Sequence, residues 1–461
     1  MMYQQVLQNA VGRAPVRVAV LGAGTFGASI VSHAAYVPAL CVGAVGDTNL
    51  EAARQAYRQA GIPDSQVVIC ENVREAAAAL ESGRYVVTAD AHILFGLSID
   101  VVVEATGSAE AGADHARAAI AQGKHVAMVT KEADAAVGPI LKHHADAAGV
   151  VYTAVDGDQH GLLISLVTWA RVIGLEVICG GKMLDAELLV EHAPPGLVLY
   201  GRRHALAAED AGFFAPFPDD LRESVRARAG RLGGMGGAKP WDLAELTIAA
   251  NATGLAPDVP QTHCPACWTT EIPAVLCPRE LGGVLAGSGR IEAAQILRQP
   301  HEASLGGGVF VVVANRGEAM RKIMAPKGMI CHPNGATAML MRPHHLLGIE
   351  AIGSILAAAL VNTPTGAVEY RPRFDVVYRT TRARAAGEDV GDDHSPALSA
   401  EIVPAVGLTP GAAVPAGLAS QGRLCRALPA GVLITGADIE RPARSVLWDL
   451  REEQERTFAQ R

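Results

Sequence analysis

The stretch VRVAVLGAGTFG, residues 16–27, constrains the fold more than any other part of the chain. A run of apolar, β-branched residues leads into a Gly-x-Gly-x-x-Gly pattern, and small residues follow. This order predicts a buried strand, a tight glycine turn and the first turn of a helix. The glycines fit the turn, a close approach of backbone to a pyrophosphate, and the packing of helix on strand. The phosphates would bind the free N–H groups of the helix N-terminus. The residues predicted to contact a dinucleotide here are Gly22, Gly24, Thr25, Phe26 and Gly27.

A second apolar strand, 39–46, ends at Asp47, twenty residues after Gly27. A carboxylate at this point accepts hydrogen bonds from the adenosine ribose hydroxyls, which favours NAD over NADP. Arg54, which lies about two helical turns further on, keeps NADP open as the alternative. Asp47 would also fit as a cap of the next helix, and the two roles are compatible.

Strand-like and helix-like segments alternate from residue 16 to about residue 152. The strand IDVVVE, 99–104, is continuously apolar, as in a parallel sheet that is buried on both faces. Ligands of such sheets bind beyond the carboxyl ends of the strands. We therefore expect Thr106, Gly107 and Thr130, which follow two such strands, to contact the cofactor.

Two charged residues at strand ends are candidates for catalysis. The ammonium group of Lys131 would stabilise developing alkoxide charge or relay a proton. The alternative is that Lys131 begins a helix and its ammonium group lies in solvent. Asp158 would orient a lysine or help to hold a divalent ion, or it would cap the helix that begins near residue 160.

Composition limits the classes of function. A chain of 461 residues, half of them hydrophobic, has room for two or three domains. Its net charge of −8 argues against a nucleic-acid partner. Eight cysteines without a secretory signal indicate reduced thiols in a cytoplasm, and no apolar run is long enough for a membrane span. We expect a cytoplasmic homo-oligomer that acts on a small molecule.

Two long stretches carry a family resemblance, VEATGSAEAGADHARAAIAQGKHVAMVTKE (103–132) and VVYTAVDGDQHG (150–161). They resemble the homoserine dehydrogenase superfamily. More closely, the chain is similar to the subgroup with a C-terminal SAF (β-clip) domain. This subgroup includes the DXR-like (DRL) reductoisomerases, which act on 1-deoxyxylulose 5-phosphate. Further marks of the resemblance are the segments 249–258, 279–285 and 342–350.

The pattern and the resemblance together predict an α/β fold in three parts. Residues 1–160 would form a Rossmann domain with a doubly wound parallel sheet. Residues 161–365 would form an inserted α+β substrate domain. Residues 366–461 would form a small, all-β, SAF-like domain with a charged linker and tail, in which 380–395 is exposed or mobile.

In the middle region, Lys182 follows two glycines after an expected strand, 174–179, and is predicted to approach a ligand rather than to lie on the surface. The resemblance also points to Lys239, although it lies farther before Glu245 than the family pattern has it. Arg342 and His345 are predicted to bind a phosphate or carboxylate of the substrate. Their alternative is to pair with nearby carboxylates. His344 stands where the family has an aromatic residue.

Two further segments have open interpretations. The loop GGMGG, 233–237, lies in a long connection and is a plausible lid. The cluster of His263, Cys264, Cys267 and Cys277 suggests zinc or a redox pair, but packed free thiols are favoured.

The residues and the resemblance together predict an NAD(P)-dependent oxidoreductase acting on CH–OH groups. The resemblance implies that hydride transfer takes place either alone or coupled to an isomerisation. A divalent metal that chelates substrate oxygens is compatible with this chemistry, and no ligands are assigned to it. The alternatives are a homoserine-like dehydrogenase without isomerisation and a non-catalytic NAD(P)-binding sensor or scaffold. Against the homoserine-like dehydrogenase, the middle region of the sequence shows no identifiable pairing of a lysine with acidic residues. The predicted catalytic residues are Lys131, Asp158, Lys182, Lys239 and His345.

Overall fold

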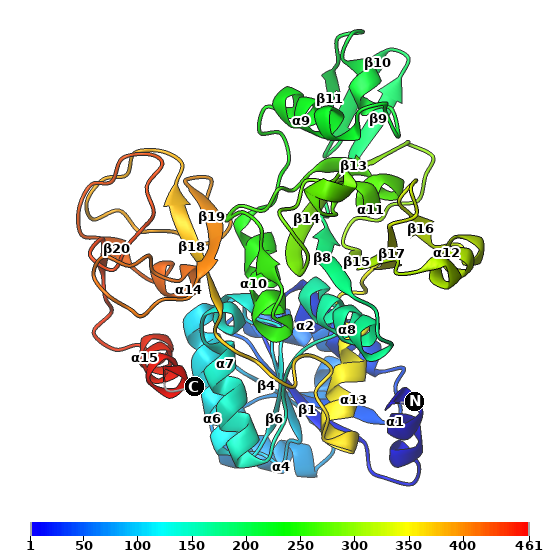
Figure 1. Cartoon of the computed structure of the whole chain (residues 1–461). Coiled ribbons are helices and arrows are strands. Elements are labelled where there is room, and N and C mark those ends of the chain that lie inside the picture. Colours follow the sequence, from blue (N-terminus) through cyan, green and yellow to red (C-terminus); the bar gives the residue numbers. More distant parts are fainter. Residues whose placement is uncertain (1, 460–461) are drawn as a thin grey trace. The chain divides into compact units, whose positions relative to one another are not determined.

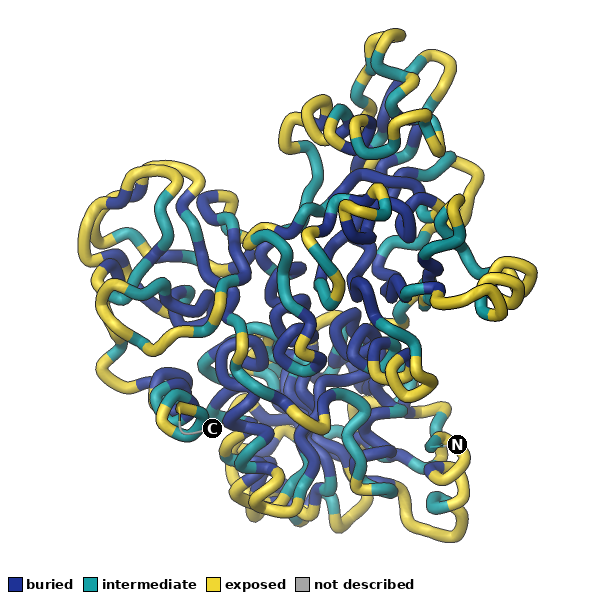
Figure 2. The backbone as a smooth tube through the Cα atoms, viewed as in Figure 1, coloured by how far each residue is buried: buried dark blue, intermediate teal, exposed yellow. Residues whose placement is uncertain are grey.

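The computed structural model describes residues 2–459 and divides into two compact units. Unit 1 comprises Met1–Gly161, Leu346–Leu398 and Ala405–Arg461, and unit 2 comprises Leu162–His345 and Ser399–Pro404. The order of helices and strands along the chain can be followed in Figure 1. In both units the strands are mostly buried and many of the connecting loops are exposed, as Figure 2 shows.

Unit 1 contains a seven-stranded parallel sheet with the order β3-β4-β2-β1-β5-β6-β7. The predicted α/β class with a doubly wound parallel sheet is confirmed. The order reverses between β1 and β5, which is the point where such sheets bind their ligands. The strands are β1 (Val16–Leu21), β2 (Leu40–Gly46), β3 (Val67–Ile69), β4 (Tyr85–Thr88), β5 (Val101–Glu104), β6 (His125–Met128) and β7 (Tyr152–Ala154).

Helices cover this sheet, and several are capped as their sequences require. Ser108 accepts a hydrogen bond from the N–H of Ala111 at the start of α6, and Gly149 ends α7 in the left-handed conformation. The helices are α1 (Met2–Ala10), α2 (Thr25–Ala34), α3 (Leu50–Gln59), α4 (Val73–Glu81), α5 (His92–Phe95), α6 (Ala109–Ala121), α7 (Lys131–Ala148), α13 (Ala351–Val361), α14 (Ala416–Ala419) and α15 (Val446–Phe458), with a 3₁₀ turn at Asp64–Gln66. The helix α8 (Gln159–Val172) begins in unit 1 and continues into unit 2.

A single apolar cluster joins the sheet of unit 1 to a helix from far along the chain. Ala351 and Ile355 of α13 pack in the same cluster as Val18 and Val20 of β1. Burial of these apolar side chains stabilises the sheet that leads into the glycine turn.

Unit 2 is built on a mixed sheet whose main path runs β11-β10-β9-β14-β8-β15-β17-β16, with β12 and β13 also paired to β14. The strands are β8 (Val177–Met183), β9 (Leu188–His192), β10 (Pro195–Leu199), β11 (Arg202–Ala205), β12 (Ala256–Pro257), β13 (Ala266–Trp268), β14 (Arg290–Arg298), β15 (Val309–Ala314), β16 (Ile330–Cys331) and β17 (Thr337–Arg342). The helices are α9 (Leu221–Leu232), α10 (Pro240–Thr253), α11 (Ile272–Val275) and α12 (Glu318–Met324), with 3₁₀ turns at Ala211–Phe214, Thr269–Glu271, Arg279–Leu281 and Ala325–Lys327.

Two expectations for the middle region need correction. Lys182 lies inside β8 rather than after a strand, because the strand starts later than expected and continues through both glycines. The segment 197–237, expected to be mainly connecting structure, contains part of β10, all of β11 and α9. That the loop 233–237 acts as a lid stays a prediction.

The C-terminal part of the chain adds the strands β18 (Phe374–Thr380), β19 (Leu398–Pro404), β20 (Arg423–Leu424) and β21 (Ile439–Glu440), with β20 and β21 antiparallel. The expectation that 380–395 is exposed was wrong for Arg384 and Val390, which are buried. The guanidinium of Arg384 donates to Glu388 and to the backbone carbonyls of Asp389 and Val390, which satisfies it inside the fold. The charged tail forms α15, and residues 460 and 461 lie outside the described part.

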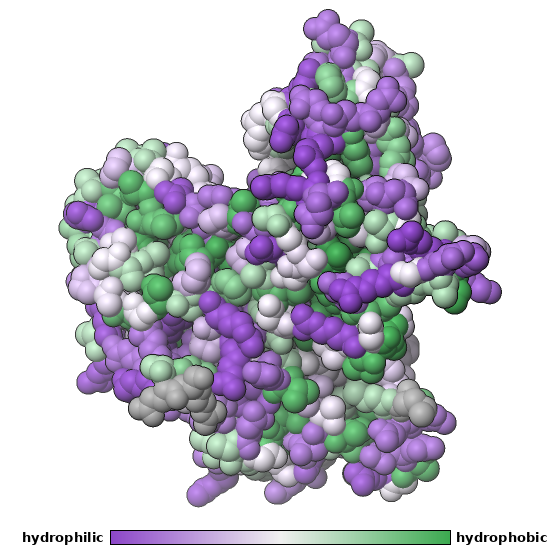
Figure 3. Space-filling model, in the orientation of Figure 1, coloured by the Kyte–Doolittle hydropathy of each residue, from purple (hydrophilic) through white to green (hydrophobic). Residues whose placement is uncertain are grey.

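None of the helices in residues 2–459 has the length and apolar character needed to cross a membrane. On the face drawn in Figure 3, hydrophilic and hydrophobic residues are interspersed.

Candidate active site

The glycine turn of unit 1 lies at the switch point of the sheet. Gly22 has a positive φ of 91°, and a Cβ there would clash with the backbone carbonyl of Ala105 at the end of β5. A Cβ on Gly27 would clash with the carbonyl of Gly22, so helix α2 packs directly on the turn. Gly24, by contrast, faces open space. These three environments fit a turn that leaves its backbone accessible to a pyrophosphate.

The N-terminus of α2 fits the same ligand. Thr25 is its first residue, and the N-cap Gly24 contributes no side-chain hydrogen bond. Its first N–H groups are therefore left for a ligand or water, in the positive end of the helix dipole. A cavity of roughly 530 Å³ beside α2 includes Gly24 and Thr25 in its lining.

Asp47 links the ends of two strands. Its Oδ2 accepts a hydrogen bond from the N–H of Ala23 at 2.6 Å, and its Oδ1 accepts one from Asn49 at 2.7 Å. The cap of α3 is Asn49 itself, so capping is not the direct role of Asp47. A carboxylate has about four acceptor positions, so both oxygens retain capacity for ribose hydroxyls.

The ends of β5 and β6 are tied together by hydroxyl groups. Thr106 Oγ1 donates to Glu104 Oε1 at 2.7 Å, and the N–H of Gly107 donates to Thr130 Oγ1 at 3.0 Å. The structure thus brings together the three residues that were predicted to contact the cofactor at these strand ends. Glu104 is fully buried, and sequence reasoning did not single it out.

Lys131 begins α7, directly after Thr130. Two carboxyl groups interact with its charge, Glu132 and Asp393, the latter from the C-terminal part of unit 1. Burial raises the pKa of Glu132 to about 7, and the neighbouring Lys131 partly opposes this shift. Neither carboxyl was among the predicted site residues.

Asp158 lies immediately before α8, where its Oδ1 accepts a hydrogen bond from the N–H of Gln159 at 2.8 Å. The same oxygen lies 3.5 Å from Nδ1 of His160. This geometry resembles the capping alternative more than a catalytic contact.

Lys182 of unit 2 is buried, with 1% of its surface exposed. Its Nζ donates to Asp242 Oδ1 at 2.6 Å and also to Glu245 Oε2. Both carboxylates stand on α10, one helical turn apart, and so face the same strand. Sequence reasoning missed this pairing of a lysine with two acidic residues and counted its absence against a homoserine-like dehydrogenase.

The electrostatics of this cluster keep Lys182 charged. Desolvation by burial acts to lower its pKa, but attraction to Glu245 and Asp242 outweighs it, and the pKa is raised. Asp185 also interacts with Lys182, and burial raises the pKa of its carboxyl. The cluster therefore holds a permanent cation beside a carboxyl group that is easier to protonate than usual.

The strand register places Arg342 on the same face of the sheet as Lys182. Val309 of β15 is opposite Lys182 on one side and opposite Arg342 on the other, in antiparallel pairs. Side chains directly opposite each other in such pairs lie on one face. At a strand spacing of about 4.8 Å, the backbones of Lys182 and Arg342 are roughly 10 Å apart.

His345 lies close to Asp185. A Cβ on Gly307, whose φ is 80°, would meet both the imidazole of His345 and Oδ1 of Asp185. His345 and Asp185 also interact through their charges. Unit 2 thus brings together three of its four predicted residues, Lys182, Arg342 and His345.

Lys239, the fourth, is the N-cap residue of α10. Its backbone N–H donates to Asp242 Oδ2 at 2.7 Å, which fixes the carboxylate that holds Lys182. The contribution that the structure records for Lys239 is therefore made by its backbone.

Cys264, Cys267 and Cys277, for which zinc binding or a redox pair was considered, are free thiols. Burial raises the pKa of Cys264 to about 12 and that of Cys277 to about 11, which makes both poor thiolates. Among residues 2–459, no group of three or more His, Cys, Asp or Glu side chains is arranged to hold a metal ion.

Comparison with known proteins finds two family models that match parts of the chain. Residues 236–351 match the family model for the catalytic domain of oxidoreductase DRL. Residues 41–153 match the model for the NAD-binding domain of homoserine dehydrogenase. These two matches support a DRL-type, homoserine dehydrogenase-like oxidoreductase. The DRL segment contains Asp242, Glu245 and His345, and the NAD-binding segment contains Asp47 and Lys131. The match to an NAD-binding domain supports a nicotinamide dinucleotide as the cofactor. The SAF assignment of the C-terminal part stays a prediction.

A search of curated proteins found no match. Among solved structures, the chain is similar to GenD2 from gentamicin A biosynthesis in complex with NAD, with 18% identity over 38% of this chain and 45% of that chain, and a TM-score of 0.26. A probable dehydrogenase from Thermotoga maritima has 13% identity over 76% of this chain and 91% of that chain, with a TM-score of 0.38. A myo-inositol dehydrogenase from Lactobacillus casei has 16% identity over 37% and 46%, with a TM-score of 0.26. The chain covers less than half the length of GenD2 and of the myo-inositol dehydrogenase.

Proposed function

We propose that this oxidoreductase uses NAD to interconvert a hydroxyl and a carbonyl group on a small substrate that bears a phosphate or carboxylate. The observation that carries the proposal is the buried Lys182 between Asp242 and Glu245, on one face of a sheet with Arg342.

Lys182 would stabilise negative charge on the reacting oxygen. An ammonium group has three N–H donors, and two of those of Lys182 point to carboxylates. The third is free to donate to a substrate oxygen as it becomes an alkoxide. Because its pKa is raised, Lys182 would act as a fixed cation rather than as a general base.

Asp185 and His345 would carry the proton. The raised pKa of Asp185 lets its carboxyl exchange a proton with an alkoxide under milder conditions than an ordinary aspartate. The adjacent imidazole of His345 has one ring nitrogen that can accept a proton and one that can donate it, and it would pass the proton on. Arg342 would hold the anionic group of the substrate through its planar guanidinium.

A bound nicotinamide supplies or accepts the hydride. Gly22, Gly24 and Thr25 would hold its pyrophosphate, and Asp47 would accept hydrogen bonds from the adenosine ribose. The choice of NAD over NADP is supported by Arg54, whose Nη2 is 2.9 Å from Asp64 Oδ2. A paired guanidinium of this kind is poorly suited to binding a 2′-phosphate.

A reductoisomerase is the second candidate, and the match to the DRL catalytic domain favours it. Its skeleton rearrangement would accompany the same hydride transfer. NMR analysis of the product separates the two candidates, because a simple dehydrogenase leaves the carbon skeleton unchanged.

Replacing Lys182 tests the proposal. The Lys182→Met variant keeps the length of the side chain and removes its charge. We expect kcat for the hydroxyl or keto substrate to fall by about 10²- to 10⁴-fold, while the Kd for NADH, measured by fluorescence, is unchanged. Asp185→Asn, which keeps shape and removes the proton-carrying group, should also lower kcat and flatten the pH profile.

Controls keep this test independent of folding. Circular dichroism and thermal unfolding establish whether Lys182→Met folds despite leaving two carboxylates without their cation. If it does not fold, Asp185→Asn alone decides the proposal. Full activity in a folded Lys182→Met protein, or weaker NADH binding with kcat unchanged at saturating NADH, would contradict the assigned roles.

A further inference from the structure

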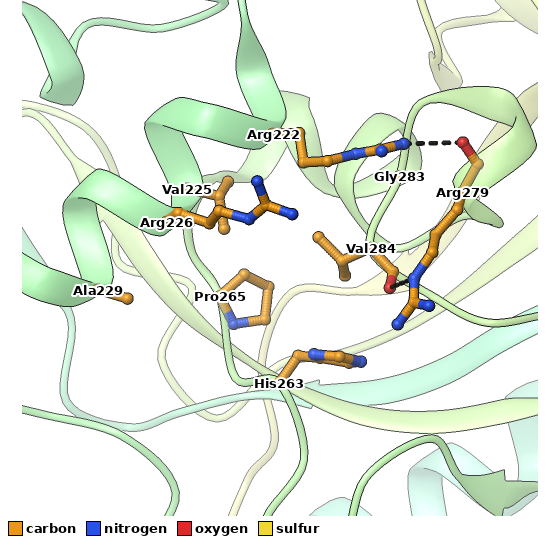
Figure 4. A pocket seen from close by; sticks show the side chains of 9 residues that line it. All are labelled: Arg222, Val225, Arg226, Ala229, His263, Pro265, Arg279, Gly283 and Val284. Carbon is orange, nitrogen blue, oxygen red and sulfur yellow. Dashed lines mark hydrogen bonds between the residues drawn. The ribbon is translucent and has the colours of Figure 1, made fainter.

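Unit 2 contains a pocket that the proposed reaction does not use. It has a volume of roughly 520 Å³, within the range of small-molecule sites. Figure 4 shows side chains from α9, from the loop before β13 and from the turn after α11. The lining residues are Arg222, Val225, Arg226, Ala229, His263, Pro265, Arg279, Gly283 and Val284.

The lining is strongly cationic. Its charge comes from three arginines, and no carboxylate is among its nine residues. The imidazole of His263, which also lines it, is paired with Asp258. The guanidiniums of Arg222 and Arg226 extend in the same direction in Figure 4, toward the turn that bears Arg279. Such a concentration of positive charge attracts anions.

Two of these guanidiniums are held in place without being neutralised. Arg222 Nη2 donates to the backbone carbonyl of Arg279 at 2.8 Å, and Arg279 Nε donates to the carbonyl of Val284 at 3.2 Å. A carbonyl fixes a guanidinium but leaves its full charge, whereas a carboxylate would cancel it. Arg226 pairs with Glu223 at 3.7 Å, on an exposed helix face where an ion pair is weak.

The remainder of the lining is apolar. Val225 is buried in the core of unit 2, and Val284 packs against the same core. Pro265 and Ala229 extend this surface. The pocket therefore pairs a cationic rim with an apolar wall, which suits an anion attached to a carbon body.

The pocket lies on the other face of the sheet from Lys182. Successive residues of a strand point to opposite faces, so Met183 faces away from the side of Lys182 on β8. Met183 belongs to the same apolar cluster as Val225 and Val284. The cationic pocket is consequently separate from the group proposed to act on the substrate.

We propose that this pocket is a second ligand site, which binds a small organic phosphate. Each guanidinium offers a rigid fork of N–H donors that matches phosphate oxygens. A phosphate dianion has three terminal oxygens arranged tetrahedrally and can engage several forks from different directions. A carboxylate has two oxygens in one plane and is less suited to forks that approach from different directions. The carbon body of the ligand would lie against Val225, Val284 and Pro265.

Calorimetric titration of the full chain with phenyl phosphate tests the inference. We expect saturable binding, weakened at least about tenfold by Arg222→Gln and by Arg279→Gln, because each removes a charged hydrogen-bond donor. Arg202→Gln, which removes an exposed arginine of β11 in the same unit, should bind as the unchanged protein does. Thermal unfolding without phosphate checks that each variant is folded.

Three further probes make the result decisive. Inorganic phosphate should bind more weakly than phenyl phosphate, since it lacks a body for the apolar wall, and equal binding would overturn that part of the inference. Benzoate binding as tightly as phenyl phosphate would overturn the choice of phosphate. Titration of Lys182→Met separates this site from the active site. If Lys182→Met loses phenyl phosphate binding while Arg222→Gln and Arg279→Gln keep it, the second site is overturned. The same follows if the unchanged protein shows no binding at about 10 mM ligand.

Discussion

At the scale of single residues, Asp47 shows how one side chain serves structure and specificity together. Its two oxygens accept backbone N–H groups from Ala23 and Asn49, so the carboxylate is fixed beside the glycine turn. A fixed negative charge at this position repels a 2′-phosphate and accepts the hydroxyls of an unphosphorylated ribose.

The preference for NAD should therefore depend on that charge. In Asp47→Asn the side-chain oxygen can still accept from Ala23, but the charge is lost. We expect the ratio of kcat/KM for NADH to that for NADPH to fall by about five- to tenfold, which corresponds to about 1 kcal/mol of charge repulsion near a surface. Asp114→Asn, a half-buried carboxylate elsewhere in unit 1, is the matched control. An unchanged ratio in Asp47→Asn would refute the assignment.

Glu292 is a second residue whose protonation should change a measurable property, here the free energy of unfolding. It is fully buried on β14, its Oε2 accepts the N–H of His263 at 2.8 Å, and its Oε1 has no hydrogen-bond partner. Burial raises its pKa to about 8, although backbone hydrogen bonds partly oppose the shift. The folded protein thus binds this proton more tightly than the unfolded chain does.

The sign of the pH dependence follows from linkage. Between the unfolded pKa of about 4.3 and the folded pKa of about 8, the folded state holds more protons, so stability falls as pH rises. Glu292→Gln removes this dependence while keeping an oxygen for His263. We expect the variant to gain stability relative to the unchanged protein by about 1–3 kcal/mol between pH 5 and about pH 8, in urea unfolding. If the free energies of unfolding of the two proteins change with pH in parallel, the pKa of Glu292 is not raised in the folded state.

At the scale of elements, α13 supports the nucleotide-binding sheet from a distant part of the chain. Ile355 is fully buried in the cluster that includes Val18 and Val20 of β1. Removing its side chain would leave a cavity beneath the strand that leads into Gly22.

Truncating this residue should destabilise unit 1. We expect Ile355→Ala to lower the free energy of unfolding by about 2–5 kcal/mol, the usual cost of a large cavity in a core. The exposed Val368→Ala serves as the control and should change stability little. Urea unfolding followed by circular dichroism measures both, and equal effects would show that α13 is not part of a cooperative core.

The elements also show what the sequence could predict. The strand, turn and helix from β1 to α2 are set by adjacent residues, so the conformations of Gly22 and Gly27 were readable from a local pattern. The partners of Lys182 were not, because Asp242 and Glu245 lie about sixty residues away and meet it only through packing of α10 on β8. Strand pairing, which has no local signal, likewise decides that Arg342 shares the face of Lys182.

At the scale of the whole molecule, the two units are interleaved along the chain. Unit 1 is assembled from three segments, and unit 2 lies mainly in the interval between the first two. The predicted boundaries at residues 160 and 365 treat the parts as consecutive. The pattern of apolar and polar residues shows where one type of element gives way to another. It does not show that a later segment, such as α13, returns to pack on an earlier sheet.

That return has a consequence for synthesis on the ribosome. The seven strands of the Rossmann sheet are complete at Ala154, but α13 begins only at Ala351, roughly 200 residues later. At typical rates of translation, the valine-rich surface that α13 covers stays open to water for on the order of tens of seconds. Throughout that interval the nascent chain exposes an apolar surface on which aggregation can start.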